Sequence, residues 1–139
     1  MTRRIYPDSC VLIYRIQHVE PWASAIARAL EPLENLHFFV TDLTLLECRV
    51  FPLRQGDTDL LGLYDRFFKR SNVTRIPLAG RVFDLATELR AAHPLKTPDA
   101  LHLAAAISAG CDEFLTNNQR LAKAAANRIR IVAINEETL

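Results

Sequence analysis

Short apolar runs alternate along the chain with longer stretches in which apolar residues recur every three or four positions. The short runs predict strands, which fall at residues 3–7, 37–40, 73–78, 113–116 and 129–134. The periodic stretches predict helices, which fall at residues 11–16, 21–33, 43–54, 60–70, 79–92, 97–109 and 118–126. Helices long enough to cross over between successive strands favour parallel pairing. The pattern therefore predicts a three-layer α/β/α fold with a central, mostly parallel sheet of about five strands.

The helix predicted at 43–54 has distinct ends and one apolar face. Thr41 and Asp42 are expected to cap its beginning, and Pro52 predicts an end or a kink. Three residues at helical spacing predict its apolar face: Leu43, Leu46 and Val50. The helix predicted at 97–109 opens with Thr97 as its capping residue and Pro98 in its first position, and Gly110 ends it.

Length and composition favour one globular domain spanning residues 1–139. Half of the residues are hydrophobic, and the net charge is +1, so no global charge indicates a nucleic-acid or membrane partner. No apolar stretch approaches the ~20 residues of a spanning helix, and no signal peptide is evident. We therefore expect a cytoplasmic protein without membrane attachment. Three cysteines without paired spacing are expected to be reduced and mostly buried: Cys10, Cys48 and Cys111.

Four polar side chains follow the predicted strands in positions that suit a functional site. Asp8 follows the first strand, and Asn118 follows the fourth. Glu47 lies about 8 Å into the helix after the second strand, so its side chain reaches back, and Asp99 opens a helix near the same edge. Because parallel sheets bind ligands beyond the carboxyl ends of their strands, we expect these side chains to converge.

Each of these carboxylates also has a structural alternative. Asp99 alone is typical of an acid that stabilises a helix start. Glu47 alone completes Thr44-x-x-Glu47, which resembles a capping box. For Asp8 a functional role is as well supported as a structural one, because an unpaired charge between an apolar strand and an apolar helix would cost several kcal/mol. Together the three would repel one another unless a cation neutralised them, and hard oxygen ligands suit Mg²⁺ or Mn²⁺, which deliver water to a phosphodiester.

Four segments in order along nearly the whole chain resemble PIN domains, and more narrowly VapC-type toxin ribonucleases. They are residues 5–14 (IYPDSCVLIY), 41–47 (TDLTLLE), 96–106 (KTPDALHLAAA) and 114–118 (FLTNN). The resemblance implies a PIN-like fold and an endoribonuclease that depends on Mg²⁺ or Mn²⁺. It also implies an RNA substrate, a cognate antitoxin and a homodimer. On this basis Asp8, Glu47 and Asp99 are expected to be catalytic metal ligands, with Asn118 as an auxiliary catalytic group.

The chain departs from the family pattern at two positions. Asn118 stands where the family usually has a fourth acid, and Cys10 stands where it usually has Ser or Asn. Ser9 and Thr116 fit the pattern and are candidates to hydrogen-bond the carboxylates, although Ser9 fits a helix-capping role equally well. Two alternative functions therefore stay open: a PIN-like RNA-binding or protein-interaction module with an impaired site, and a PIN nuclease of RNA processing or DNA repair without an antitoxin.

Other polar residues give weaker signals. His102 follows Asp99 by three positions, and a packed helix histidine is favoured over an RNA contact or a group behind the metal ligands. Asp112 precedes the fourth strand and is expected at the opposite edge. Five basic residues near the expected site are either phosphate contacts or a solvated face: Arg49, Arg54, Lys96, Arg120 and Lys123.

Overall fold

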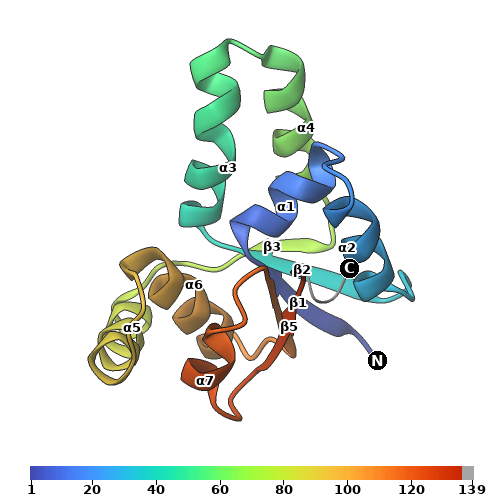
Figure 1. The fold of residues 1–139 in the computed structure, drawn as a ribbon. Coiled ribbons are helices and arrows are strands. Elements are labelled where there is room, and N and C mark those ends of the chain that lie inside the picture. The colour runs from blue at the N-terminus through green and yellow to red at the C-terminus, as the bar shows by residue number, and fades with distance from the viewer. Residues whose placement is uncertain (136–139) are drawn as a thin grey trace.

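The computed structural model describes residues 1–135, and a central sheet divides them into two helical layers (Figure 1). Within this range the sheet has five strands: β1 (Arg3–Pro7), β2 (Leu36–Val40), β3 (Val73–Arg75), β4 (Glu113–Thr116) and β5 (Arg130–Ala133). Their order is β3-β2-β1-β4-β5, and every neighbouring pair is parallel. All carboxyl ends therefore lie at one edge, and the predicted α/β fold is confirmed.

Helices cover both faces of the sheet. One layer contains α1 (Ser9–Ile16), α2 (Trp22–Leu30), α3 (Asp42–Gln55) and α4 (Thr58–Phe68), and the other contains α5 (Gly80–Ala92), α6 (Thr97–Ser108) and α7 (Leu121–Ala125) (Figure 1). Successive residues of β1 serve opposite layers: Ile5 packs in the core beneath α1 to α4, and Tyr6 packs in the core beneath α5 to α7. Both faces of the central strand are buried from Ile5 to Pro7, as expected for a parallel sheet that helices cover on both faces.

The alanine-rich helix α6 packs closely in the second layer. Four of its alanines, Ala100, Ala104, Ala105 and Ala106, have no exposed surface. Gly110 follows this helix with φ +71°, a conformation that glycine adopts without strain. The helix therefore ends where the sequence predicts.

At the amino edge of the sheet, a partly buried ion pair joins β1 to β4. The Arg3 guanidinium donates to both carboxylate oxygens of Glu113, at 2.7 and 3.0 Å. It also donates to the backbone carbonyl of Ala29 at 2.7 Å. Arg3 therefore fixes the end of α2 to the central strands at the edge opposite the predicted site. No helix within residues 1–135 has the length and apolar character needed to cross a membrane.

Several predicted boundaries are wrong for local reasons. The third strand ends at Arg75 rather than Leu78. Helix α2 ends at Leu30, because Glu31 precedes a proline and adopts an extended conformation. Helix α3 continues through Pro52 to Gln55, and the left-handed Gly56 ends it. Helix α7 begins only at Leu121.

Thr41 caps α3 as predicted, whereas the cap of α6 differs from the prediction. Lys96, rather than Thr97, is the extended residue before α6, so Thr97 and Pro98 lie within its first turn. The capping box of α3 pairs Thr41 with Thr44 and leaves Glu47 out. Glu47 is therefore available to face the carboxyl edge of the sheet.

The predicted apolar face of α3 is wrong as a core face. Leu46 is 59% exposed and Val50 is 39% exposed. The buried residues of this helix are Thr44, Cys48 and Pro52. The helix meets the sheet only near its first turns and then runs outward beside α4 (Figure 1), so most of its apolar residues have no layer to pack against.

Candidate active site

Asp8 occupies the tip of the central strand and caps α1. The backbone N–H of Ser9 donates to its Oδ1 at 2.8 Å, and the Thr116 hydroxyl donates to its Oδ2 at 2.9 Å. Its own N–H donates to the carbonyl of Leu115 at 2.7 Å. The carboxylate is thus held by both α1 and β4, and the hydrogen bond expected of Thr116 is present.

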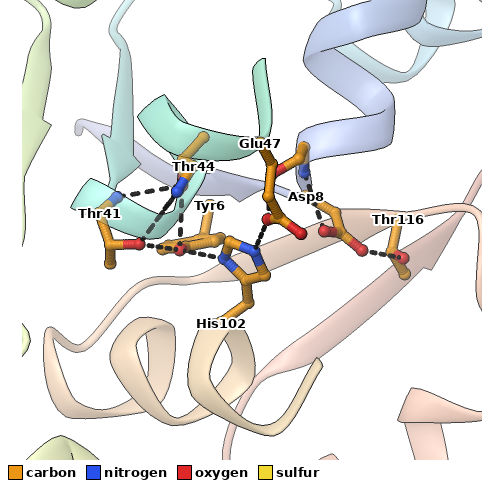
Figure 2. A network of polar contacts seen from close by, with 8 residues as sticks. Tyr6, Asp8, Thr41, Thr44, Glu47, His102 and Thr116 are labelled. Carbon is orange, nitrogen blue, oxygen red and sulfur yellow. Dashed lines mark hydrogen bonds and ion pairs between the residues drawn. The ribbon is translucent and has the colours of Figure 1, made fainter. Parts of the chain in front are cut away.

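Glu47 extends from α3 toward the same edge. Its Oε1 accepts from the Ser9 hydroxyl at 2.8 Å and lies 2.5 Å from Nε2 of His102 (Figure 2). Burial would raise the pKa of Glu47, but the hydrogen bond and charge of His102 and the Ser9 hydroxyl lower it below its usual value. Glu47 is therefore an ionised carboxylate at neutral pH.

Ser9 joins two of the predicted ligands. Its backbone N–H binds Asp8 and its hydroxyl binds Glu47, so one residue at the start of α1 orients both carboxylates. Of the two roles considered from the sequence, hydrogen bonding to a carboxylate is observed, whereas helix capping is wrong, because Asp8 is the N-cap and Ser9 is the first residue of α1. Ser9 is buried, which keeps competing water away from these bonds.

Asp99 lies half-buried in the first turn of α6 and is repelled electrostatically by the carboxylates of Asp8 and Glu47. Burial and the charge of Asp8 raise the pKa of Asp99, and the charge of Glu47 adds to the rise, while His102 and Lys96 oppose it. Asp99 also lines a hollow of about 410 Å³, whose other lining residues are Pro94, Leu95, Lys96, Asn117, Asn118 and Arg120. The repulsion on Asp99 is of the kind that a bound cation relieves.

Asn118 lines this hollow but acts on the carboxylates indirectly. Its side-chain Oδ1 accepts from the backbone N–H of Arg120 at 3.1 Å, which forms the turn before α7. Its own backbone N–H donates to the Thr116 hydroxyl at 3.1 Å, and that hydroxyl donates to Asp8. Asn118 therefore holds Thr116 in the orientation that supports Asp8.

The four predicted site residues lie at the carboxyl edge of the sheet, but not as a preassembled metal cage. Within residues 1–135, no three His, Cys, Asp or Glu side chains form a group arranged to hold a metal ion. Hydrogen bonds link Asp8 with Glu47 through Ser9, and charge interactions link both with Asp99. Carboxylate oxygens from three separate elements are nevertheless the donors that Mg²⁺ and Mn²⁺ prefer. The residues present fit such an ion chemically.

Two buried aromatic residues behind Glu47 complete the polar network in Figure 2. His102 is only 1% exposed, so it is the packed helix histidine favoured from the sequence, yet it also contacts Glu47. The phenol oxygen of Tyr6 lies 2.6 Å from Nδ1 of His102. Sequence reasoning missed Tyr6, although the hydroxyl of a tyrosine in a buried strand must find a hydrogen-bond partner.

Cys10 borders the site as an inert group. Burial and the charge of Asp8 raise the pKa of the Cys10 thiol to about 12, so it stays protonated at neutral pH. All three cysteines are free, as predicted, and Cys48 and Cys111 are buried. Asp112 lies at the amino edge, where its carboxylate accepts from the backbone N–H of Arg4 at 2.8 Å.

A model of the PIN domain matches residues 5–127. The chain belongs to the PIN domain family. At the level of sequence, no curated protein matches this PIN domain. The predicted resemblance to PIN domains is therefore confirmed by the family match.

Solved structures share the fold of this PIN domain at low sequence identity. The VapBC2 complex of Rickettsia felis bound to a promoter DNA fragment is 17% identical, with a TM-score of 0.71 over 95% of this chain and 98% of that chain. DNA-bound VapBC of Salmonella typhimurium is also 17% identical, with a TM-score of 0.72 over 96% and 98%. VapC20 of Mycobacterium tuberculosis, a sarcin-ricin loop cleaving toxin, is 13% identical, with a TM-score of 0.71 over 91% and 98%.

Proposed function

We propose that this PIN domain is a metal-dependent endoribonuclease that acts as the toxin of a toxin–antitoxin pair. The observation that carries the proposal is the placement of Asp8, Glu47 and Asp99 at the carboxyl edge of the sheet, where burial and the charges of Asp8 and Glu47 raise the pKa of Asp99. Carboxylates from three elements that repel one another are typical of a site for a divalent cation.

Asp8, Glu47 and Asp99 would hold Mg²⁺ or Mn²⁺. The ion, when bound, would polarise a phosphodiester and lower the pKa of an attacking water. Thr116 and Ser9 fix the orientation of Asp8, and Ser9 and His102 fix that of Glu47. Asn118 would assist catalysis by keeping Thr116 bonded to Asp8.

The hollow beside Asp99 is the proposed place for the RNA backbone. Lys96 and Arg120 line it, and both side chains are exposed, so they can meet phosphates. Arg49 is a weaker candidate, because its guanidinium donates to Asp65 at 3.0 Å. An RNA substrate would place the protein in the cytoplasm.

The proposed protein partners are a cognate antitoxin and a second copy of the chain. The VapBC complexes with this fold support an antitoxin, and the sarcin-ricin loop cleaving toxin supports an RNA substrate. Exposed apolar side chains on α3 and α4 favour a protein-covered surface: Leu46, Val50, Phe51, Leu53 and Leu63. A non-catalytic RNA-binding or interaction module is the second candidate, favoured by the missing charge at Asn118.

Cleavage of total cellular RNA with added Mn²⁺ or Mg²⁺, mapped at nucleotide resolution, tests the proposal. We expect cleavage at defined sites that EDTA abolishes. Asp8→Asn removes a charge with little change in volume and is expected to abolish cleavage. Asp84→Asn, at an exposed position of α5 in the other layer, is the matched control and is expected to cleave normally. Normal cleavage by Asp8→Asn would exclude Asp8 as a ligand, and RNA binding without cleavage would favour the non-catalytic module.

A further inference from the structure

We propose that His102 is a positioning residue for Glu47 and that Tyr6 sets the hydrogen-bonding direction of His102. The inference rests on the proposed function, in which Glu47 binds the metal ion. Neither His102 nor Tyr6 touches the reacting groups in this proposal. They determine where the Glu47 carboxylate points before the ion arrives.

The contacts form a continuous path that leaves α3, reaches α6 in the other layer and returns through β1 (Figure 2). Nε2 of His102 lies 2.5 Å from Oε1 of Glu47, and Nδ1 lies 2.6 Å from the Tyr6 hydroxyl. The Tyr6 oxygen in turn lies 3.2 Å from the Thr41 hydroxyl and 3.3 Å from the Thr44 hydroxyl. Thr41 and Thr44 form the capping box of α3, the helix that carries Glu47. The path therefore returns to the helix on which it begins.

The chemistry of these groups fixes the direction of the hydrogen bonds. An ionised carboxylate only accepts, so Nε2 of His102 carries the proton that it shares with Glu47. Burial raises the pKa of Tyr6, so its phenol keeps its proton and presents a donor to Nδ1 of His102 at 2.6 Å. Thr41 and Thr44 can then donate to the phenol oxygen. Tyr6 thereby favours the tautomer in which Nε2–H faces Glu47.

This contact also joins two helices that lie on opposite faces of the sheet. His102 follows Asp99 by three residues on α6, whereas Glu47 belongs to α3 (Figure 1). A bond between His102 and Glu47 therefore ties the helix of one proposed ligand to the side chain of another. Ser9 fixes Glu47 from the side of Asp8, so the two donors hold Oε1 from two elements.

His102→Met and His102→Gln separate this role from packing. Methionine has a similar length without a donor, whereas the glutamine amide N–H can reach the place of Nε2–H. We expect His102→Met to bind Mn²⁺ about 10- to 100-fold more weakly than the native protein, as measured by calorimetry without RNA. His102→Gln is expected to recover most of that affinity.

Tyr6→Phe provides a second test that leaves His102 in place. Loss of the phenol hydroxyl removes the preference for one tautomer, so we expect weaker Mn²⁺ binding in the same direction but by a smaller factor. Tyr14→Phe is the matched control, because Tyr14 stacks on Trp22 away from the path, and it is expected to bind Mn²⁺ normally. If His102→Met does not fold, the comparison of Tyr6→Phe with Tyr14→Phe decides.

The outcomes separate this inference from the proposed function. A native protein that does not bind Mn²⁺ overturns both. Native binding with unchanged affinity in His102→Met and Tyr6→Phe overturns the positioning role alone and leaves the metal site intact. Equal losses of Mn²⁺ affinity in His102→Met and His102→Gln would also overturn the positioning role, because a donor at the place of Nε2 would then make no difference. Weak binding by His102→Met with recovery by His102→Gln supports it.

Discussion

Single side chains in this PIN domain connect groups that are far apart in sequence. Ser9 binds Asp8 through its backbone and Glu47 through its hydroxyl, across 38 positions. Thr116 supports Asp8 across 108 positions. The sequence predicts that Ser9 and Thr116 serve the carboxylates, because both fit the family pattern, Ser9 next to Asp8 and Thr116 two residues before Asn118. Tyr6 and His102 could not be assigned that way, since a buried polar residue reveals its partner only once the layers are packed.

Ser9→Ala should weaken metal binding and leave the fold intact. The backbone N–H that caps Asp8 persists, but Glu47 loses one of two donors to Oε1, so we expect about tenfold weaker Mn²⁺ affinity and about 1 kcal/mol lower stability. Ser24→Ala is a matched control, because the Ser24 hydroxyl also donates to a glutamate, Glu20, at an exposed place. Calorimetry and urea unfolding measure both effects. Equal Mn²⁺ affinity in the two variants would contradict the role of Ser9.

Asn118→Asp should increase the affinity for the metal ion and lower the stability of the metal-free protein. An aspartate keeps the acceptor for the Arg120 N–H, so the turn before α7 is retained. The added charge attracts a divalent cation, and we expect the Mn²⁺ concentration for half-maximal cleavage to fall on the order of tenfold. Repulsion from Asp8 and Asp99 should lower the melting temperature of the metal-free variant. Unchanged metal dependence and unchanged melting would place Asn118 outside the site.

At the scale of elements, the helical periodicity located the helices, but it did not identify the buried face of α3. Helix α3 has apolar residues on more than one side, and only contact with the sheet decides that Cys48 is buried while Leu46 is exposed. The alternative capping box of Thr44 with Glu47 does not form, for a related reason. Thr44 pairs with Thr41 and faces the Tyr6 hydroxyl, a long-range contact that no local pattern contains.

Replacement of two glycines at helix ends by alanine should change the stability of the protein in opposite directions. Gly56 ends α3 with φ +65°, so Gly56→Ala forces a left-handed alanine and is expected to cost about 1 kcal/mol. Gly80 opens α5 without a positive φ, and a Cβ there would meet nothing within 4 Å. Gly80→Ala is therefore expected to stabilise by about 0.4 to 1 kcal/mol. Midpoints of urea unfolding compare the two, and a neutral Gly56→Ala would contradict the assigned cap.

For the whole molecule, the succession of strands and helices was enough to predict a parallel sheet and the edge at which the candidate residues lie. The strand order β3-β2-β1-β4-β5 places β1 between β2 and β4, so Asp8 lies at the middle of that edge. The exact separation of Asp8, Glu47 and Asp99 was beyond prediction, because it depends on the positions of α3 and α6 relative to the carboxyl ends of the strands. Those positions follow from side-chain packing in the hydrophobic cores on both faces of the sheet.

The stability of the metal-free protein should depend on pH through Asp99. Burial and neighbouring carboxylates raise the pKa of Asp99 above its usual value of 3.8, so the folded state binds this proton more tightly than the unfolded chain. Stability should therefore fall as pH rises from about 4 through the folded pKa. Glu47 acts with the opposite sign at lower pH, because its pKa is lowered.

Asp99→Asn should flatten this decline, and saturating Mn²⁺ should offset it in the native protein only. Urea unfolding at a series of pH values, with and without Mn²⁺, measures both effects. A native protein whose metal-free stability declines no more steeply than that of Asp99→Asn would contradict the repulsion assigned to Asp99.

The hydrogen bond from Thr116 to Asp8 also determines when, during synthesis of the chain, Asp8 can be oriented. During synthesis the ribosome releases Asp8 108 residues before the threonine that orients it, and β4 is needed to complete one side of the central strand. At about 5 to 20 residues per second, the interval is on the order of 5 to 20 s. A nascent chain in that interval therefore lacks the contact that orients Asp8 in the candidate site. The candidate site of this PIN domain can therefore assemble only after β4 has been made.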